Sequence, residues 1–289
     1  MRRKKHKSNK HMEKAYKSFH LWLMILALII CVSEVSFGII DVSENKNVGS
    51  RETSSLIVKD VFNEENKSLR KSFIEPIYRV NTEDKKIALT FDLNWADEEY
   101  LYEILDILDK YNAKGTFFVM GRWLVYPDKE NQEKLKEICK RGHEIGNHSY
   151  THADFKNINK DKMIKEIKNT EKVIKDITGV TTKLFRFPSG HYNQDGVKVA
   201  KSLGYEAIQW DVDSIDWKQL GLEQEYNRVI KKAKAGSIVL FHNNGRHTPK
   251  NLERLIPVLQ NQGYKFVPVG QLIYKDGFYI DNEGVQRLE

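Results

Sequence analysis

The chain has few cysteines and no internal repeat. Its only two cysteines are Cys31, which lies in an apolar run near the N-terminus, and Cys139. The part of the chain after that run therefore has a single thiol and cannot form an internal disulfide. A folded domain there must be stabilised by its hydrophobic core. With 289 residues, the chain is long enough for one large core or two smaller ones.

Outside the first twenty residues the chain also lacks any net excess of positive charge. Residues 1–20 carry eight Lys and Arg residues and one acidic residue, Glu13, a net charge of +7 that equals the +7 of the whole chain. The remaining residues therefore sum to zero. The basic excess belongs to a short tail rather than to a folded face, so we exclude nucleic acid as the main partner.

An uninterrupted hydrophobic run of membrane-spanning length is missing as well. The apolar run that starts at Leu21 continues for about a dozen residues, whereas a spanning helix prefers roughly 20. Extending the run to Ile40 restores that length and includes one charged residue, Glu34. Because a basic tail precedes the run, we expect residues 1–20 in the cytoplasm, a transmembrane signal anchor over 21–40 and the rest outside the membrane. A cleaved signal peptide is the alternative, although no small-x-small cleavage site stands out.

The remainder of the chain divides by composition. Residues 41–84 are polar and predict an extracytoplasmic spacer. From residue 85 to 273, short β-rich runs alternate with amphipathic helical patterns, a rhythm that indicates a parallel sheet. Residues 274–289 form a C-terminal extension. We expect strands over Ile87–Asp92, Thr116–Met120, Glu144–His148, Leu184–Phe187, Ala207–Asp213, Ile238–His242 and Phe266–Val269. We expect helices over Glu98–Tyr111, Lys160–Thr178, Gly196–Leu203, Glu223–Ala235 and Pro249–Gln262.

Glycines follow helical runs at positions where a left-handed cap would end the helix. They are Gly142, Gly179, Gly204, Gly236 and Gly263. Seven strand–helix units result, which predicts a closed or nearly closed barrel. In such a barrel, side chains at the C-terminal ends of different strands converge.

Two histidines four residues apart, His148 and His152, follow one predicted strand. Such a pair can hold one transition metal, but the spacing alone is weak evidence. Other chemistry-bearing residues stand at or just after the ends of other predicted strands. They are Asp92, Arg186, Asp213, Asp216 and His242.

Five ordered blocks carry a resemblance to the polysaccharide deacetylases of the NodB-homology group, carbohydrate esterase family 4. The blocks are Thr90-Phe91-Asp92, His148-Ser149-Tyr150-Thr151-His152, Phe185-Arg186-Phe187-Pro188-Ser189-Gly190, Asp213-Ser214-Ile215-Asp216-Trp217 and Leu240-Phe241-His242. The resemblance implies a distorted (β/α)7 barrel and an N-deacetylase that uses one divalent metal ion: zinc, or cobalt, nickel or manganese.

The resemblance also implies roles for individual residues. Asp92 matches the general base and Arg186 the residue that fixes it, while His242 matches the general acid. Asp216, with Asp213 as a second candidate, matches the carboxylate that orients the acid histidine. The substrate-binding matches are the backbone N–H of Ser189 as oxyanion donor, and Trp217 and Leu240 as apolar walls around the acetyl methyl group.

One position departs from the family pattern. The family has a second Asp after the first, which is its third metal ligand, whereas this chain has Leu93. Asp97 or Asn94 could complete the metal site together with His148 and His152, water could do so, or the affinity for metal could be lowered. We favour Asp97, because a carboxylate is the better ligand for a divalent cation.

The variant first block and the N-terminal anchor resemble sporulation-associated and cell-wall deacetylases of Gram-positive bacteria. This implies peptidoglycan as the substrate, with N-acetylglucosamine or N-acetylmuramic acid as the sugar. We expect the protein to be a monomer. The alternatives are a catalytically weak or inactive glycan-binding relative, motivated by Leu93, and an acetyl-xylan-type esterase. Among the other histidines, we expect His143 and His191 to be structural or surface residues, and we consider His247 as a substrate contact.

Overall fold

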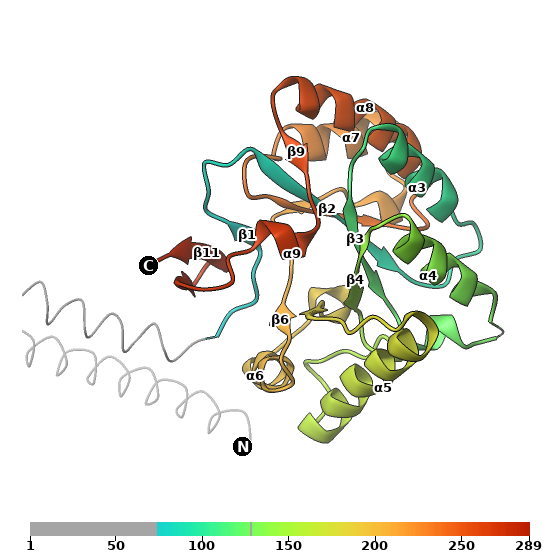
Figure 1. Cartoon of the computed structure of the whole chain (residues 1–289), viewed down its shortest axis with the longest axis vertical. Helices are drawn as coiled ribbons and strands as arrows, with labels where there is room; N and C mark the ends of the chain where they lie inside the picture. The colour runs from blue at the N-terminus through green and yellow to red at the C-terminus, as the bar shows by residue number, and fades with distance from the viewer. Residues whose placement is uncertain (1–73, 128) are drawn as a thin grey trace, which may run out of the picture. The chain divides into compact units, whose positions relative to one another are not determined.

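The computed structural model describes residues 74–127 and 129–289. A sheet of parallel strands lies at the centre of this part, and helices pack around it (Figure 1). The strands of this sheet are β2 (Lys86–Leu93), β3 (Gly115–Val119), β4 (Glu144–Asn147), β5 (Leu184–Phe185), β6 (Glu206–Ala207), β7 (Val212–Asp213), β8 (Ile238–His242) and β9 (Lys265–Phe266). The helices are α3 (Leu101–Lys110), α4 (Glu130–Lys140), α5 (Lys160–Thr178), α6 (Gln194–Ser202), α7 (Leu222–Ile230), α8 (Thr248–Asn261) and α9 (Val269–Leu272).

The hydrogen-bonded path of this sheet runs β6-β5-β4-β3-β2-β8-β7, and β9 pairs with the start of β2. The two ends of the path, β6 and β7, are consecutive in the chain and are joined by residues 208–211. The chain thus connects both ends of the sheet. This confirms a parallel-strand α/β fold, and the circular path is consistent with a distorted barrel of seven strand–helix units.

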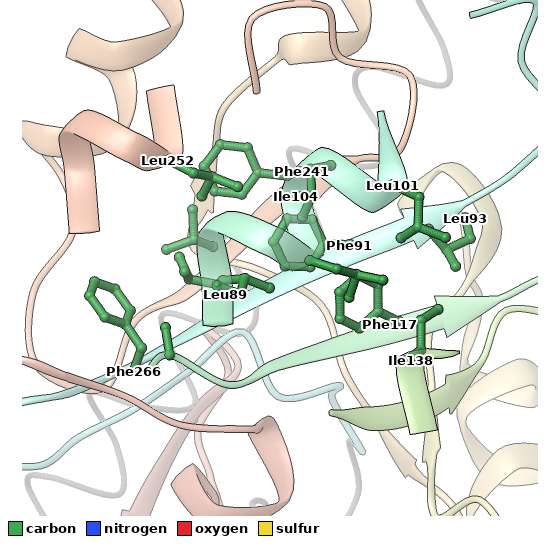
Figure 2. Close-up of a cluster of buried hydrophobic side chains, with 14 of the residues drawn as sticks. Leu89, Phe91, Leu93, Leu101, Ile104, Phe117, Ile138, Phe241, Leu252 and Phe266 are labelled. Carbon is green, nitrogen blue, oxygen red and sulfur yellow. The ribbon is translucent and has the colours of Figure 1, made fainter. Parts of the chain in front are cut away.

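Alternation along β2 separates the core from the interior of the barrel. Leu89, Phe91 and Leu93 point outward into the main hydrophobic cluster, which α3, α4 and α8 cover (Figure 2). The side chains between them, Thr90 and Asp92, face the other side, because successive residues of a strand alternate between its faces. Leu93 is fully buried. Leu93, which stands where the family pattern has a second Asp, is therefore part of the core rather than of the barrel interior.

Two predicted strands differ from the structure. Ala207–Asp213 is not one strand, because its first part pairs with β5 and its last part with β8, so the chain must change partners between them. Phe266–Val269 is shorter than predicted, since Pro268 precedes α9 and Val269 already belongs to that helix. Each glycine predicted to cap a helix has a positive φ, between 73° and 88°.

Residues on both sides of the predicted domain also have structure. A second, three-stranded sheet has the order β1-β11-β10, with β1 (Arg79–Val80) parallel to β11 (Val285–Leu288) and β10 (Phe278–Ile280) antiparallel to it. Ile77 and Val80 are fully buried in the second hydrophobic cluster. The end of the predicted spacer and the C-terminal extension therefore pack with the barrel.

The predicted membrane segment, 21–40, lies outside the described residues. Within 74–127 and 129–289, none of the helices combines the length and the apolar character that a membrane span requires.

Candidate active site

A cleft of about 470 Å³ opens at the C-terminal ends of the parallel strands. Strand register brings its central residues together, because Asp92 at the end of β2 is directly opposite His242 at the end of β8. The lining residues are Asp92, Asn94, Trp95, His148, His152, Ser189, His191, Trp210, Asp213, Trp217, Leu240, His242 and Asn244. Residues from all five sequence blocks thus border one cavity or support it from behind.

Asp92 and Arg186 form a buried ion pair at the floor of the cleft. The Nη1 atom of Arg186 donates to Oδ1 of Asp92 over 2.9 Å and to Oγ1 of Thr90 over 2.9 Å, and Nη2 donates to the carbonyl of Gln209 over 3.1 Å. The guanidinium is fully buried and lies over the ring of Phe118, at 4.0 Å from its centroid. Arg186 is therefore held by fixed partners and does not itself line the cleft.

The other oxygen of Asp92 faces the cleft, where Oδ2 lies 3.5 Å from Nε2 of His148. Burial by itself raises the pKa of Asp92, but the charge that His148 carries at acid pH and the charges of Arg186 and His242 together outweigh it and hold the pKa below its usual value. Asp92 is therefore a carboxylate at neutral pH. One oxygen is bound by Arg186 and the other is available to the cleft.

The two histidines of the second block lie on a turn that follows β4 (Glu144–Asn147). Ser149 and His152 both have left-handed backbone conformations, with φ of 65° and 57°. The buried carboxylate of Glu166 in α5 stabilises this turn, since it accepts hydrogen bonds from the backbone N–H groups of Tyr150 and Thr151 and from the hydroxyl of Thr151. The turn brings the imidazole rings of His148 and His152 to a centroid distance of 5.1 Å.

The environment of His148 keeps it neutral and directs one nitrogen toward the cleft. Its Nδ1 lies 3.0 Å from the carbonyl oxygen of Arg186, a partner that requires a proton on Nδ1 and leaves the lone pair on Nε2. Burial lowers the pKa of His148 to about 4, and burial also lowers the pKa of His152. Neutral imidazoles are the form that binds metal ions.

The side chains in this region fit a metal ion in part. The chemistry of two neutral imidazoles suits a divalent transition metal. Among the described residues, however, no group of three or more His, Cys, Asp or Glu side chains is placed to hold an ion. Asp97, the favoured third ligand, is exposed and is not one of the residues that line the cleft, whereas Asn94 lines it. The two histidines would thus bind an ion whose remaining positions are filled by water or substrate.

His242 and Asp216 form a second pair on the opposite side of the cleft. Nδ1 of His242 lies 2.8 Å from Oδ1 of Asp216. The buried carboxylate of Asp216 also accepts hydrogen bonds from the backbone N–H of His242 and the hydroxyl of Thr248. Burial of His242 disfavours its charged form, but the hydrogen bond and charge of Asp216 prevail, with further contributions from Asp92 and Asp213, so the pKa of His242 is raised.

The remaining predicted residues line the cleft in different ways. Asp213 accepts a hydrogen bond from the backbone N–H of Ile215 and does not contact His242 through a hydrogen bond, so Asp216 is the carboxylate that orients the histidine. Ser189 has a left-handed conformation, with φ of 54°, in the turn η2 (Pro188–Gly190). Leu240 is buried, whereas Trp217 is 52 % exposed and therefore belongs to the wall of the cleft rather than to the core.

Several residues of the site were not anticipated from the sequence. Trp95, Trp210 and His191 line the cleft, and His191 is also exposed, as expected for a surface residue. Glu166 lies in the middle of α5, where its carboxylate would ordinarily be assigned to a solvated helix face. Its helical spacing to the buried Met163 and Thr170, three residues before it and four after it, is the local signal that it lies on the inner face.

The other two histidines of the described residues lie outside the cleft lining. His143 is buried and accepts a hydrogen bond at Nδ1 from the backbone N–H of Gly115. Burial lowers the pKa of His143 to about 4. His247 lies 3.3 Å, through Nδ1, from Oε1 of Glu225. Both contacts are compatible with structural roles.

Comparison with known proteins gives the same family in sequence and in structure. The family model for polysaccharide deacetylases matches residues 79–208. A peptidoglycan-N-acetylglucosamine deacetylase of Bacillus cereus is 37 % identical over 205 residues, which cover 68 % of this chain and 92 % of the relative. The peptidoglycan-N-acetylmuramic acid deacetylase PdaA of Bacillus subtilis is 34 % identical over 205 residues, which cover 70 % of this chain and 76 % of the relative.

Among solved structures, the chain is similar to a wild-type pseudoenzyme of carbohydrate esterase family 4 from Bacillus anthracis. The TM-score is 0.64 at 37 % identity, with 68 % of each chain covered. A mutant of this pseudoenzyme with restored enzymatic activity has the same TM-score at 38 % identity, with 68 % of this chain and 71 % of the mutant covered. From these matches and the five blocks that meet at one cleft, the chain belongs to the polysaccharide deacetylases of carbohydrate esterase family 4, hydrolases that act on C–N bonds other than peptide bonds.

Proposed function

We propose that this protein is a metal-dependent N-deacetylase that removes acetyl groups from N-acetylglucosamine or N-acetylmuramic acid in peptidoglycan. The observation that carries the proposal is the pairing across the cleft. A carboxylate supported by a buried cation, Asp92 with Arg186, faces a cation supported by a buried carboxylate, His242 with Asp216. Hydrolysis of an amide needs a base for the attacking water and an acid for the departing amine, and these two pairs supply one of each.

In this proposal Asp92 is the general base. Its Oδ2 faces the cleft, and its lowered pKa keeps it ionised so that it can accept a proton from water. Arg186 binds the other oxygen and prevents the carboxylate from turning away. The hydrogen bond from Arg186 to Thr90 orients the guanidinium in turn. A base with a low pKa is a weak proton acceptor, so the attacking water must be acidified by another group.

A divalent metal ion held by His148 and His152 would supply that acidification and would polarise the acetyl carbonyl. Zinc, cobalt, nickel and manganese are the candidates. The backbone N–H of Ser189 would donate to the developing oxyanion. Leu240 and Trp217 would enclose the acetyl methyl group, since both border the cleft close to His242.

His242 is the general acid in this proposal. Its raised pKa keeps the imidazole protonated at neutral pH to a greater extent than a free histidine, and Nε2 is the nitrogen left for the substrate once Nδ1 is bound to Asp216. Proton donation from Nε2 to the amine would release the deacetylated sugar. Asp216 stabilises the imidazolium before transfer and stays in place afterwards through Thr248.

The proposed location is the outer face of the cell membrane. The basic tail 1–20 and the apolar run 21–40 support an uncleaved anchor, or a secreted protein if the run is cleaved. The domain would then reach peptidoglycan through the chain that precedes residue 74.

Acetate release from N-acetylglucosamine oligomers and from muropeptides tests the proposal. We expect Asp92→Asn to lower kcat by about 10²- to 10⁴-fold, because it removes the base, and His148→Ala to abolish activity. Asp176→Asn, which makes the same chemical change at an exposed position of α5, is the control and should leave kcat unchanged. Full acetate release by His148→Ala after metal removal would contradict the mechanism. An acetyl ester assayed in parallel separates an N-deacetylase from an esterase.

A second candidate is an inactive relative that binds glycan, and two observations favour it. Leu93 lies in the hydrophobic core and cannot ligate a metal ion, and the solved structures that the chain matches include a family pseudoenzyme. Calorimetric titration with zinc, cobalt and nickel distinguishes the candidates. Binding at micromolar concentration that is lost in His152→Ala supports the enzyme, whereas no binding even at high micromolar concentration supports the inactive relative.

A further inference from the structure

An exposed aromatic cluster at the rim of the cleft is not used by the proposed chemistry. It consists of Trp95, Tyr126 and Arg122, which we call the rim platform. The indole of Trp95 is 40 % exposed and the phenol ring of Tyr126 is 54 % exposed, although large apolar side chains are usually covered. Their ring centroids are 6.4 Å apart at an interplanar angle of 88°. The guanidinium carbon of Arg122 lies 4.8 Å from the centroid of Tyr126 and 5.9 Å from that of Trp95.

The rim platform has a defined position rather than being a set of loose side chains. Nε1 of Trp95 donates to the carbonyl of Tyr126 over 3.0 Å, which links the loop after β2 to the loop after η1 (Arg122–Leu124). The buried side chain of Asn243, next to His242, both accepts from the backbone N–H of Asn94 and donates to its carbonyl. Trp95 is thereby fixed to the same chain segment that carries the candidate acid.

The rim platform is continuous with the cleft, because Trp95 and Asn94 are themselves lining residues. When one sugar of a polysaccharide is bound in the cleft, the sugars next to it must lie over the rim. The faces of pyranose rings carry C–H groups and pack well on aromatic rings, which offer a large apolar surface at low entropic cost. An exposed indole that borders a sugar cleft is therefore placed for the next ring of the strand.

The charge of Arg122 indicates which kind of glycan strand the rim platform would bind. Among the described residues, which do not include 128, Arg122 forms no ion pair with a carboxylate, and its side chain is exposed. Where no stem peptide is attached, muramic acid carries a free lactyl carboxylate, whereas a glycan strand made of N-acetylglucosamine alone is neutral. A guanidinium held on an aromatic face can bind a carboxylate with two hydrogen bonds.

We propose that the rim platform is a second sugar-binding subsite, in which Trp95 and Tyr126 stack on the sugar next to the one in the cleft and Arg122 binds the carboxylate of a muramic acid residue. This inference rests on the proposed function for the identity of the polymer. It assigns the preference for peptidoglycan over neutral chitin-like strands to residues outside the five sequence blocks.

Calorimetry with the metal-free full chain tests the subsite without turnover. The two ligands are a glycan tetramer that contains muramic acid with free lactyl carboxylates, and the neutral tetramer of N-acetylglucosamine. We expect Trp95→Ala to weaken binding of both tetramers by about three- to tenfold, the range of a single aromatic contact. We expect Arg122→Gln to weaken binding of the muramic acid tetramer by a similar factor and to leave the neutral tetramer unaffected. Arg122→Lys should restore part of the loss, because it keeps the charge and loses the paired donors.

Tyr102→Ala is the matched control, since Tyr102 is 47 % exposed on α3 and is not a lining residue. It should bind both tetramers like the wild type. If Trp95→Ala melts at a lower temperature by circular dichroism, Tyr126→Ala replaces it with the same expected loss. Wild-type affinity in Trp95→Ala and Tyr126→Ala, or an equal loss for both tetramers in Arg122→Gln, would overturn the proposal.

The outcome is separable from that of the proposed function. A chain that releases no acetate but binds the muramic acid tetramer through Trp95 and Arg122 would refute the enzyme and uphold the subsite. Acetate release at equal efficiency from both polymers, with wild-type behaviour of the rim variants, would uphold the enzyme and refute the subsite.

Discussion

The two ion pairs of the cleft have the same chemical components and opposite arrangements. In the first pair the cation, Arg186, is fully buried and the carboxylate, Asp92, reaches the cleft. In the second pair the carboxylate, Asp216, is buried and the side chain of the cation, His242, is 21 % exposed. The partner that lies inside favours the charged form of the partner that faces the cleft, together with other charges nearby. Burial order, rather than residue type alone, thus supports the proposed roles of Asp92 as the base and His242 as the acid.

The largest expected effect comes from breaking the first pair, Arg186 with Asp92. Arg186→Met should lower the free energy of unfolding by about 3–5 kcal/mol, because Asp92 would remain as a buried charge without its partner. Urea unfolding measures the change. Arg254→Met, which removes a surface pair with Glu223, is the control and should have a far smaller effect.

A double variant, Arg186→Met with Asp92→Leu, sharpens this prediction. It removes both charges, so it should be more stable than Arg186→Met alone while remaining inactive. Equal stability of the single and double variants would mean that the uncompensated charge is not the source of the loss.

Breaking the second pair, His242 with Asp216, should mainly change the pH dependence of activity. Asp216→Asn removes the strongest influence that raises the pKa of His242, so this pKa should fall and the imidazole should lose its proton at lower pH. The alkaline limb of the kcat/KM profile should therefore move to lower pH, with kcat at neutral pH lower by about ten- to a hundredfold. The acid limb, set by Asp92, should stay in place, which serves as the internal control. An unchanged alkaline limb would show that His242 is not the acid.

The smallest of the three effects concerns the turn that carries His148 and His152. Glu166→Gln keeps the size of the side chain but weakens the hydrogen bonds to Tyr150 and Thr151, so zinc affinity should fall by about tenfold, as for other residues that support metal ligands. Glu171→Gln is the control on the same helix, since Glu171 binds Thr182 and Tyr205 instead of the turn. Equal losses of zinc affinity in both variants would point to a general effect of α5 and not to the turn.

The sequence predicted the central strands well because their patterns are strong and their ends carry polar residues. Both ends of β2, β3, β4 and β8 lie within one residue of the predicted ends. The helix α4 was not predicted, since its sequence is mostly charged and only Leu135 and Ile138 are buried. The strand Ala207–Asp213 was predicted as continuous because periodicity does not reveal that its two ends pair with different neighbours.

For the site, sequence blocks identified the residues that meet in the cleft, but not the contacts that distinguish similar residues. Asp213 and Asp216 could not be separated from the spacing, and the hydrogen bond to His242 separates them. Asp97 was favoured on ligand chemistry, but the path of the loop after β2 depends on Asn243, a residue 149 positions away from Asn94. Long-range contacts of this kind leave no local pattern, which is also why the rim platform was missed.

The way the chain enters the domain has a mechanical consequence. The backbone N–H of Ile77 donates to the carbonyl of Ala207, and the N–H of Gln209 donates to the carbonyl of Ile77. The entering chain is thus hydrogen-bonded to Ala207 and Gln209, which lie in the segment that joins both ends of the sheet. The carbonyl of Gln209 also accepts a hydrogen bond from Arg186. Tension applied ahead of residue 74 would load the contacts of Ile74 and Glu75 with Gln194 and Tyr192 first, and this junction next. From Gln209, Asp92 is two hydrogen bonds away, through the guanidinium of Arg186, so a displacement of this junction would act directly on the support of Asp92.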